Sequence, residues 1–427
     1  MQKKIIALAV AGLVSGGAFA QANVTVSGNI GISYDSYNLN GATAARTTFR
    51  QNLVADQSSA VILKGEESLG GGLTAWFQID SRLTMDRGNG GVNNWSSGLQ
   101  TSGLGNGNTA IGFKGNWGSI GFGRWDVHYD AFAPIGDVVT AGALASRIGY
   151  FGVMAQVNGG QIALGSRAAN LVWYDSPTWN GLRARVGFST NPAAGEGEAT
   201  LGLAAGGGDP GNGNAWQLRV NYDNGPWNAV WSYFKYQVEG RGDYVAAAWT
   251  LPATGGISTT PGSGAGVLGN GLNDPRDQVS NRLGMAYTFP MGVKVGIGWD
   301  RSTIKRNTAT AANAATGAAA ITAGDMTRTA WMLPISYTTG NHTMGLTYAR
   351  AGNTSNVVGS SEAKEYLVHY GYNFSKRTGV GVQYVNLKNT TAGLYSVHGA
   401  SNANTGYTGP ISGEDTSLLS VNIRHFF

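Results

Sequence analysis

The chain has 427 residues and contains no cysteine. This absence excludes disulfide bonds, thiolate metal sites and cysteine nucleophiles. A chain of this size must then be held together by its core or by closed backbone pairing.

The chain also lacks a large excess of charge of either sign. The chain carries 29 basic and 24 acidic residues, and removal of Lys3 and Lys4 with the leader described below leaves 27 basic residues and a net charge of +3. Proteins that bind nucleic acid need a clustered basic face, which this balance does not provide. We therefore expect no nucleic-acid partner.

Long apolar runs are missing from most of the chain. After residue 20, no stretch approaches the roughly 20 apolar residues that a transmembrane helix requires. If the chain crosses a membrane, it must do so with strands, because only helices and closed barrels satisfy the backbone in lipid.

The first twenty residues have the pattern of a secretory signal peptide. Lys3 and Lys4 precede an apolar run over 5–14, and small residues flank Phe19 at the expected cleavage position. Such a segment is too short for a membrane anchor. We expect residues 1–20 to be removed and 21–427 to form one domain; a retained N-terminal helix is the alternative.

Apolar and polar residues alternate with a period of two along most of the mature chain. The segment 73–82 shows the pattern, and Trp76, which falls in the polar phase, is its one exception. The same alternation runs through 182–189, 216–222, 282–289 and 293–300. Alternation over about ten residues is typical of membrane strands with lipid outside and water inside. A soluble β-sandwich or β-solenoid is the alternative, because half-buried strands also alternate.

The connections favour a barrel over these alternatives, because short and long ones follow each other in turn. Tight turns lie near 69–72, 116–118, 179–181, 224–226, 290–292, 339–341 and 375–377, and long loops near 85–106, 127–167, 190–213, 239–277 and 304–325. Bacterial outer-membrane barrels have short periplasmic turns and longer extracellular loops. Aromatic residues also gather at the strand ends, where they suit an interfacial girdle: Trp117, Trp179, Trp227, Phe289, Phe374 and Phe427.

The alternating segments can be counted as strands. Seventeen lie near 24–36, 46–56, 58–68, 73–84, 107–115, 119–126, 168–176, 181–189, 214–223, 227–238, 278–289, 292–303, 327–339, 342–350, 363–374, 378–388 and 415–427. The polar stretch 46–50 fits better in the first long loop. Without 46–56 there are sixteen strands, an even number that lets the first and last strands meet antiparallel. Residues 244–251 could add a strand, so eighteen is the main alternative.

Four motifs, in the same order along the whole mature chain, resemble the general porins of β-proteobacteria. They span Asn23–Ile30, Leu63–Leu73, Gly121–Arg124 and Ile423–Phe427. The resemblance implies an all-β protein, a sixteen-stranded antiparallel transmembrane barrel in the bacterial outer membrane. It also implies a homotrimer among lipid and lipopolysaccharide, whose third extracellular loop (127–167) folds into the lumen and narrows it.

Two details of the resemblance concern single positions. Family members often carry Ser-Arg before the strand that leads to Lys-Gly, whereas here Ser59 is followed by Ala60, so a wall arginine that would help to select anions is missing. Phe427 stands where the closing strand of the family ends. The resemblance implies that it closes the barrel and is the signal read by the machinery that inserts barrels.

The polar phase of the strands predicts the lining of the lumen. Its basic residues outnumber its acidic ones, and charges on the wall of a water-filled pore set ion selectivity. The basic residues are Lys64, Arg82, Arg183, Arg185, Arg219, Arg282, Lys294 and Arg328, and the acidic ones include Glu66, Asp80, Asp300 and Glu365. We predict that Lys64, Arg82 and Arg124 form the wall of a constriction and that Asp130 and Asp137 on the third loop face them. Strict alternation would point Arg124 outward unless a bulge intervenes. An ordinary solvated charge is the alternative at each position.

These observations predict a channel for passive diffusion of small hydrophilic solutes and ions, with a mild preference for anions. A substrate-specific channel of the eighteen-stranded sugar type, or a barrel that acts as a surface adhesin or antigen, is the alternative. No histidine lies in a serine-hydrolase or metal-ligand spacing, and the glycine-rich stretch 206–213 lacks the Lys-Ser/Thr of a phosphate loop. We expect no enzymatic activity, no cofactor and no metal.

Overall fold

The computed structural model describes residues 23–42, 48–57, 59–83, 85, 104–128, 150–161, 167–190, 192, 213–238, 277–305, 309, 311–312, 319–397 and 411–427. The predicted signal peptide and the segment 244–251 lie outside these residues. Within them, no helix is long and apolar enough to cross a membrane.

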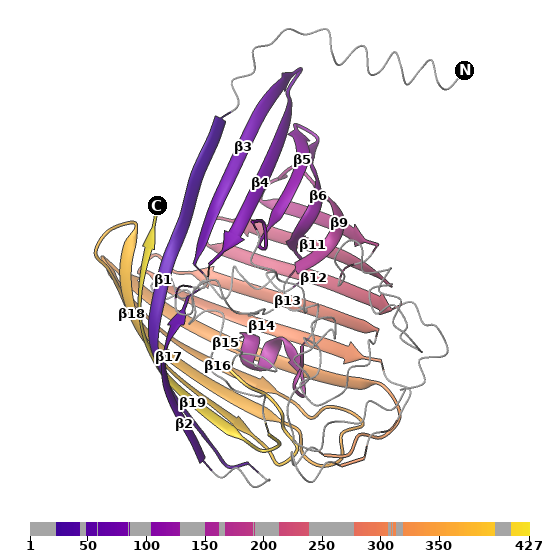
Figure 1. Ribbon diagram of the computed structural model, residues 1–427, viewed down its shortest axis with the longest axis vertical. Coiled ribbons are helices and arrows are strands. Elements are labelled where there is room, and N and C mark those ends of the chain that lie inside the picture. Colours follow the sequence, from indigo (N-terminus) through magenta and orange to yellow (C-terminus); the bar gives the residue numbers. More distant parts are fainter. Residues whose placement is uncertain are drawn as a thin grey trace.

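The strands form one antiparallel ring, in which each pairs with its neighbours in the sequence (Figure 1). The wall consists of β1 (Asn23–Asn40), β2 (Thr48–Asp56), β3 (Ala60–Gly70), β4 (Leu73–Arg82), β5 (Thr109–Gly115), β6 (Gly118–Asp126), β9 (Arg167–Asp175), β10 (Leu182–Ser189), β11 (Gly213–Asn224), β12 (Trp227–Val238), β13 (Gln278–Thr288), β14 (Val293–Ile304), β15 (Met326–Thr339), β16 (His342–Ala351), β17 (Ala363–Asn373), β18 (Thr378–Asn389) and β19 (Asp415–Phe426). Three short elements precede β9: the π-helical turn η3 (Tyr150–Met154) and the hairpin of β7 (Gln156–Val157) and β8 (Gly160–Gln161).

β2 and β3 are two halves of one barrel strand. β1 pairs with β2 over its second half and with β3 over its first half, and the register changes by one residue between them. The extra residue lies near Ser59, whose hydroxyl donates to the Gly31 carbonyl (3.1 Å) and accepts from the Gly31 N–H (3.0 Å). This side-chain bridge replaces ladder hydrogen bonds that the bulge interrupts.

The described residues therefore form a barrel of sixteen strands, which confirms the predicted number. The assignment of 46–56 to the first long loop is wrong, because residues 48–56 form the first part of the second barrel strand, which β3 continues. Polar residues in this stretch do not prevent strand pairing, since a strand that continues beyond the apolar band of a barrel needs no apolar outer face.

The first and last strands close the ring. β1 and β19 pair from Asn29 with Phe426 to Asn40 with Asp415. Gly28 and Phe427 then exchange two backbone hydrogen bonds, N–H to carbonyl in both directions, each 3.1 Å long. Closure pairs the edges that an open sheet would leave unsatisfied in lipid.

The predicted alternation is confirmed in the wall. On β14, Val295, Ile297 and Trp299 are exposed on the outer face, whereas Gly298 and Asp300 are buried on the inner face. The aromatic residues predicted for the girdle are all exposed next to the short turns. An apolar outer face with aromatic rings at its edge is the surface that a lipid bilayer requires.

The described part of the third loop lies inside the barrel. η3 packs against β15, β16 and β17, and β7 packs against β14 and β15 (Figure 1). These contacts reach the inner faces of strands on the wall opposite β6, from which the loop starts. The described parts of the third loop are thus folded inward, as the resemblance implies for the loop.

Candidate pore site

Two of the predicted wall residues lie on the inner face of neighbouring strands. In the register of β3 and β4, Lys64 pairs with Gln78 and Ala60 pairs with Arg82, so all four side chains share one face. Lys64 is exposed, and it has no acidic partner among the described residues. Its ammonium group is therefore available to ions in the lumen.

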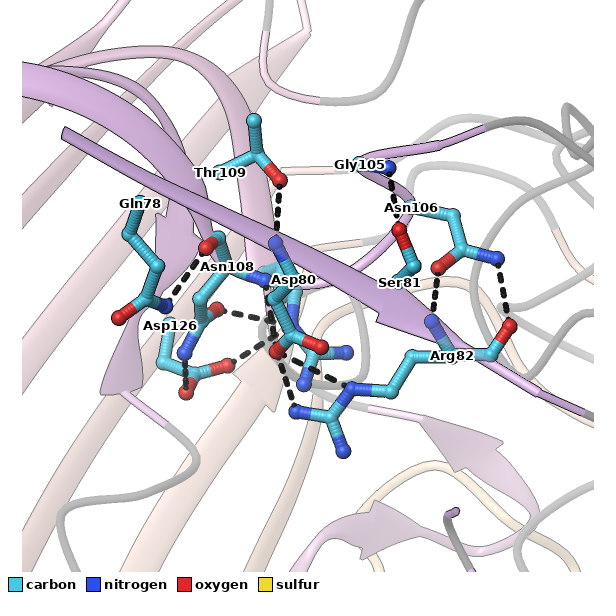
Figure 2. Close-up of polar contacts among 10 residues, drawn as sticks. Gln78, Asp80, Ser81, Arg82, Gly105, Asn106, Asn108, Thr109 and Asp126 are labelled. Atoms are coloured by element: carbon cyan, nitrogen blue, oxygen red, sulfur yellow. Dashed lines mark hydrogen bonds and ion pairs between the residues drawn. The ribbon is translucent and has the colours of Figure 1, made fainter. Parts of the chain in front are cut away.

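Arg82 is held by Asp80 on the same strand (Figure 2). Its Nη2 and Nε donate to Asp80 Oδ2 at 2.7 and 3.1 Å, and the same oxygen accepts the backbone N–H of Asn108 at 3.1 Å. The Asp80 side chain is 1% exposed, whereas that of Arg82 is 27% exposed. The buried carboxylate orients the guanidinium and neutralises its charge, so Arg82 is a weaker anion site than Lys64.

The loop before β5 is fixed to the end of β4 by side-chain hydrogen bonds. Asn106 accepts from the backbone N–H of Arg82 (2.6 Å), and Ser81 accepts from that of Gly105 (3.1 Å) (Figure 2). Asn108 donates to Asp126 and accepts from Arg167 (2.9 Å). The network joins β4, β5, β6 and β9 at the start of the third loop, and so fixes the direction in which that loop leaves the wall.

Arg124 lies beside the bulge that the prediction required. The register of β6 against β9 shifts between Gly123 and Trp125, and Gly123 has a φ of +148°, which L side chains rarely adopt. Arg124 is half-buried, and it pairs with Thr109 of β5. The bulge is confirmed, but a role of Arg124 at a constriction stays a prediction.

Asp130 and Asp137 lie outside the described residues, so their position opposite the wall also stays a prediction. The segments that flank them are described. His128 marks where the loop leaves β6, and residues 150–161 form its returning part. Both segments contact the far wall of the barrel.

His128 joins the start of the third loop to β12 and β13. Its ring nitrogens lie 2.8 Å from Ser232 Oγ and 2.7 Å from Ser280 Oγ, and the side chain is fully buried. A neutral imidazole can satisfy both contacts, with one nitrogen donating and the other accepting. Burial, together with the guanidinium groups of Arg282 and Arg219, holds the pKa of His128 well below its ordinary value of 6.5.

A buried ionic triad lies on the same wall. Asp300 of β14 accepts from Arg282 Nε (2.6 Å) and from Arg328 Nη1 (2.8 Å), and all three side chains are 0% exposed. Ser302 and Ser280 donate to the two carboxylate oxygens at 2.6 and 3.2 Å. One carboxylate serves two guanidinium groups, so the triad has an excess positive charge.

The third loop caps this triad. The Met154 carbonyl accepts from Arg282 Nη2 and from Arg328 Nη2, each at 3.1 Å. A carbonyl oxygen has two lone pairs, so it can satisfy both donors. Alternation identified the three charged residues as lumen-facing, but no sequence signal marked Met154 as their partner or His128 as the partner of Ser232 and Ser280, because these contacts join residues more than a hundred positions apart.

Glu365 and Gly152 form a second contact between loop and wall. Glu365 of β17 is 1% exposed, and a Cβ atom on Gly152 of η3 would overlap Glu365 Oε2. Neither carboxylate oxygen has a hydrogen-bond partner among the described residues. Glycine at 152 therefore allows η3 to approach this wall.

The structure also shows where the arginine that family members often carry in place of Ala60 would lie. Ala60 is fully buried on the inner face, directly opposite Arg82. An arginine there would stand beside Arg82 and raise the positive charge of this wall. Within the described residues, no group of three or more His, Asp or Glu side chains could hold a metal ion.

A closed sixteen-stranded barrel with an apolar outer face, a charged inner wall and a loop folded inward defines a channel of the outer membrane. The model of the family described as "Gram-negative porin" matches residues 7–392, and the chain belongs to this family. It is an outer-membrane porin, and the members of this family are channels.

Similar proteins and structures agree with this assignment. Outer membrane porin protein 32 of Delftia acidovorans is 27% identical over 434 residues, which cover 100% of both chains. An outer membrane porin protein of Bordetella pertussis is 28% identical over 252 residues, or 55% of this chain and 59% of that protein. Among solved structures, the anion-selective porin from Comamonas acidovorans matches with a TM-score of 0.63 and 22% identity, covering 95% of this chain and 100% of that one.

Proposed function

We propose that this porin lets small hydrophilic solutes and ions diffuse across the outer membrane with a mild preference for anions. One observation carries the preference: Arg282 and Arg328 share a single carboxylate, Asp300, on the wall beneath the third loop. A net positive charge in a wall of low dielectric constant raises the local potential and favours anions. The exposed ammonium group of Lys64 adds to this potential within direct reach of ions.

The third loop forms the constriction in this proposal. Its support is that His128, where the loop 127–167 begins, and Met154, in its returning part, both contact strands of the opposite wall. Asp130 and Asp137 then face the basic wall of Lys64, Arg82 and Arg124, and a transverse field crosses the pore. The preference is mild because these acids, and the pairing of Arg82 with Asp80, offset part of the positive charge.

Reversal potentials in a planar bilayer under a KCl gradient test the anion preference. Lys64→Glu should shift the reversal potential toward that of a cation-selective pore, because it reverses an exposed charge in the lumen. Lys364→Glu is the matched control, since Lys364 lies exposed on the outer face of β17 and should leave the potential unchanged. A cation-selective wild type, or equal effects of the two variants, would contradict the proposal.

We further propose that the protein is a homotrimer embedded in lipid and lipopolysaccharide. One solved structure with the same fold is titled as a trimer form, that of OmpT of Vibrio cholerae. Mass measurement of the protein folded in detergent should give three chains per particle. Monomers alone would contradict the trimer.

Export follows from the predicted leader. We propose that residues 1–20 direct secretion and that cleavage leaves Gln21 as the first residue of the mature domain, 21–427. N-terminal sequencing of the protein isolated from outer membranes tests this, and a chain that begins with Met1 would refute it.

A further inference from the structure

A row of tryptophan and glycine residues crosses the inner face of the barrel wall. Trp76 of β4 pairs with Gly112 of β5, Gly112 with Gly121 of β6, Gly121 with Trp173 of β9, and Trp173 with Gly187 of β10. Of these strands, β4, β5, β6 and β9 lie side by side in Figure 1. Trp76 is the residue that breaks the alternation of its strand, so this large ring lies on the inner side of the wall and not against lipid, and it is only partly buried there.

The glycines let the indole rings lie close against the wall. A Cβ atom on Gly112 would come within 2.8 Å of Cε2 and Cζ2 of Trp76, and one on Gly121 would overlap the six-membered ring of Trp173. Each indole therefore rests on the backbone of the next strand. The ring of Trp76 is inclined by 72° to that of Trp125 and by 56° to that of Trp173, so the indoles present surfaces at different angles and not one flat face.

A third indole completes the group, which we call the tryptophan platform (Trp76, Trp125 and Trp173). The ring of Trp125 stacks on that of Trp173, with centroids 5.2 Å apart and an interplanar angle of 30°, and its centroid lies 5.9 Å from that of Trp76. Trp173 is 2% exposed, whereas Trp76 and Trp125 are only half-buried. Part of the platform thus remains open to solvent.

Two ion pairs flank the platform. Lys114 Nζ lies 2.6 Å from Glu66 Oε1, and both side chains are well exposed; Glu66 is the cross-strand neighbour of Trp76. On the other side, Arg185 donates to both oxygens of Asp175 at 2.7 Å, and its guanidinium carbon lies 5.5 Å from the ring centroid of Trp173. Each flank offers donors and acceptors together and carries no net charge.

We propose that the tryptophan platform is a subsite for the pyranose ring of a neutral sugar on its way through the channel. The C–H face of a pyranose can pack on an open indole face, as apolar surfaces do on aromatic rings. Sugar hydroxyls both donate and accept hydrogen bonds, which matches flanks that contain a carboxylate and a cation side by side. An anionic ring would be repelled by Glu66 and Asp175 as much as it is attracted by their partners.

The platform lies on the path of a solute, and its rings also pack on a buried apolar cluster of the wall. Trp76 lies near the start of β4, after the turn at Gly71 and Gly72, whereas Trp125 immediately precedes the last residue of β6, so the platform extends from the periplasmic part of the wall to the point where the third loop leaves β6. A solute that has passed the loop would meet it next. The inference rests on the channel function, but not on its anion preference.

Ion current through the full-length protein in a planar bilayer tests the proposal, with D-glucose and sorbitol as probes. Sorbitol is an acyclic polyol of similar size, and its solutions have a similar viscosity. Glucose should lower the wild-type conductance more than sorbitol does at the same concentration. Trp76→Leu should weaken the glucose effect about fivefold, the usual value of one aromatic stacking contact, and Trp76→Phe should retain part of it.

Trp299→Leu is the matched control, because Trp299 is exposed on the outer face of β14 and its removal should leave the glucose effect intact. Heat-dependent gel mobility checks that each variant is folded. Equal effects of glucose and sorbitol on the wild type, or an unchanged glucose effect in folded Trp76→Leu, would overturn the proposal. Block by benzoate but not by glucose would overturn it in favour of an aromatic anion. Reversal potentials from the same recordings report the anion preference separately.

Discussion

Nε of Arg282 lies 2.6 Å from Oδ2 of Asp300, and neither side chain is exposed. The second oxygen of Asp300 binds Arg328, and the Nη2 atoms of both guanidinium groups donate to the Met154 carbonyl of the third loop. This one carboxylate therefore holds the wall together and presents the donors to which the loop binds. Wall charge and loop position are coupled here, and the following predictions use this coupling.

Asp300→Asn should destabilise the barrel by about 3–5 kcal/mol, because it removes the buried carboxylate charge that pairs with both guanidinium groups. Thermal unfolding of the protein folded in detergent measures the change. Glu67→Gln is the control: Glu67 is exposed near the first short turn, and its replacement should leave the free energy of unfolding nearly unchanged. An Asp300→Asn variant as stable as this control would contradict the prediction.

Gly152→Ala should displace η3 from the wall, because the new Cβ atom would overlap the Glu365 carboxylate. The expected result is a changed single-channel conductance with an intact barrel. Adding Glu365→Ala removes the overlapping group and should restore the wild-type value. Gly352→Ala is the control, since its Cβ would meet nothing closer than a carbonyl oxygen at 3.4 Å. Failure of the double variant to recover would show that the overlap is not the cause.

His128 should make the stability of the protein depend on pH. Its pKa in the folded protein is lowered by burial and by Arg282 and Arg219, so between that pKa and 6.5 the unfolded chain binds a proton that the folded chain does not. The stabilisation is complete above pH 6.5 and is lost as the pH falls below it, by at most about 1.4 kcal/mol per pH unit.

The difference between wild type and His128→Gln isolates this effect. Thermal unfolding at pH 7.5 and pH 5 should show a smaller loss of stability on acidification in the variant. His342→Gln, at an exposed position at the start of β16, should keep the wild-type loss. The same pH dependence in all three proteins would rule out His128 as the source.

Removal of Phe427 should impair assembly of the barrel. Its backbone exchanges two hydrogen bonds with Gly28 at the seam between the first and last strands. Phe427→Ala keeps these bonds and loses only the ring, so it separates closure of the seam from recognition of the aromatic side chain. Folded protein in outer-membrane fractions is the readout, and a normal yield after deletion would refute both roles.

The predictions from sequence succeeded where the signal is local. The period of two assigned Lys64, Arg282 and Asp300 to the inner face, because a strand turns alternate side chains to opposite sides whatever its neighbours are. It failed at 46–56, where a polar stretch resembled a loop although it continues a strand. At Arg124 the alternation alone could not settle the direction of the side chain, because the decisive bulge depends on how β6 pairs with β9.

The amino-acid sequence by itself therefore determined the class of the protein: a sixteen-stranded outer-membrane barrel with an apolar outer face and a charged lumen. It also marked Trp76 as a residue out of phase, without showing why. Only the tertiary structure decided where the third loop docks and which residues meet in the lumen. His128 reaches Ser280, Met154 reaches Arg328, and Trp76 meets Trp125 and Trp173 because closure of the barrel brings distant strands together. Such contacts follow from the register and curvature of the whole ring, and no local pattern contains them.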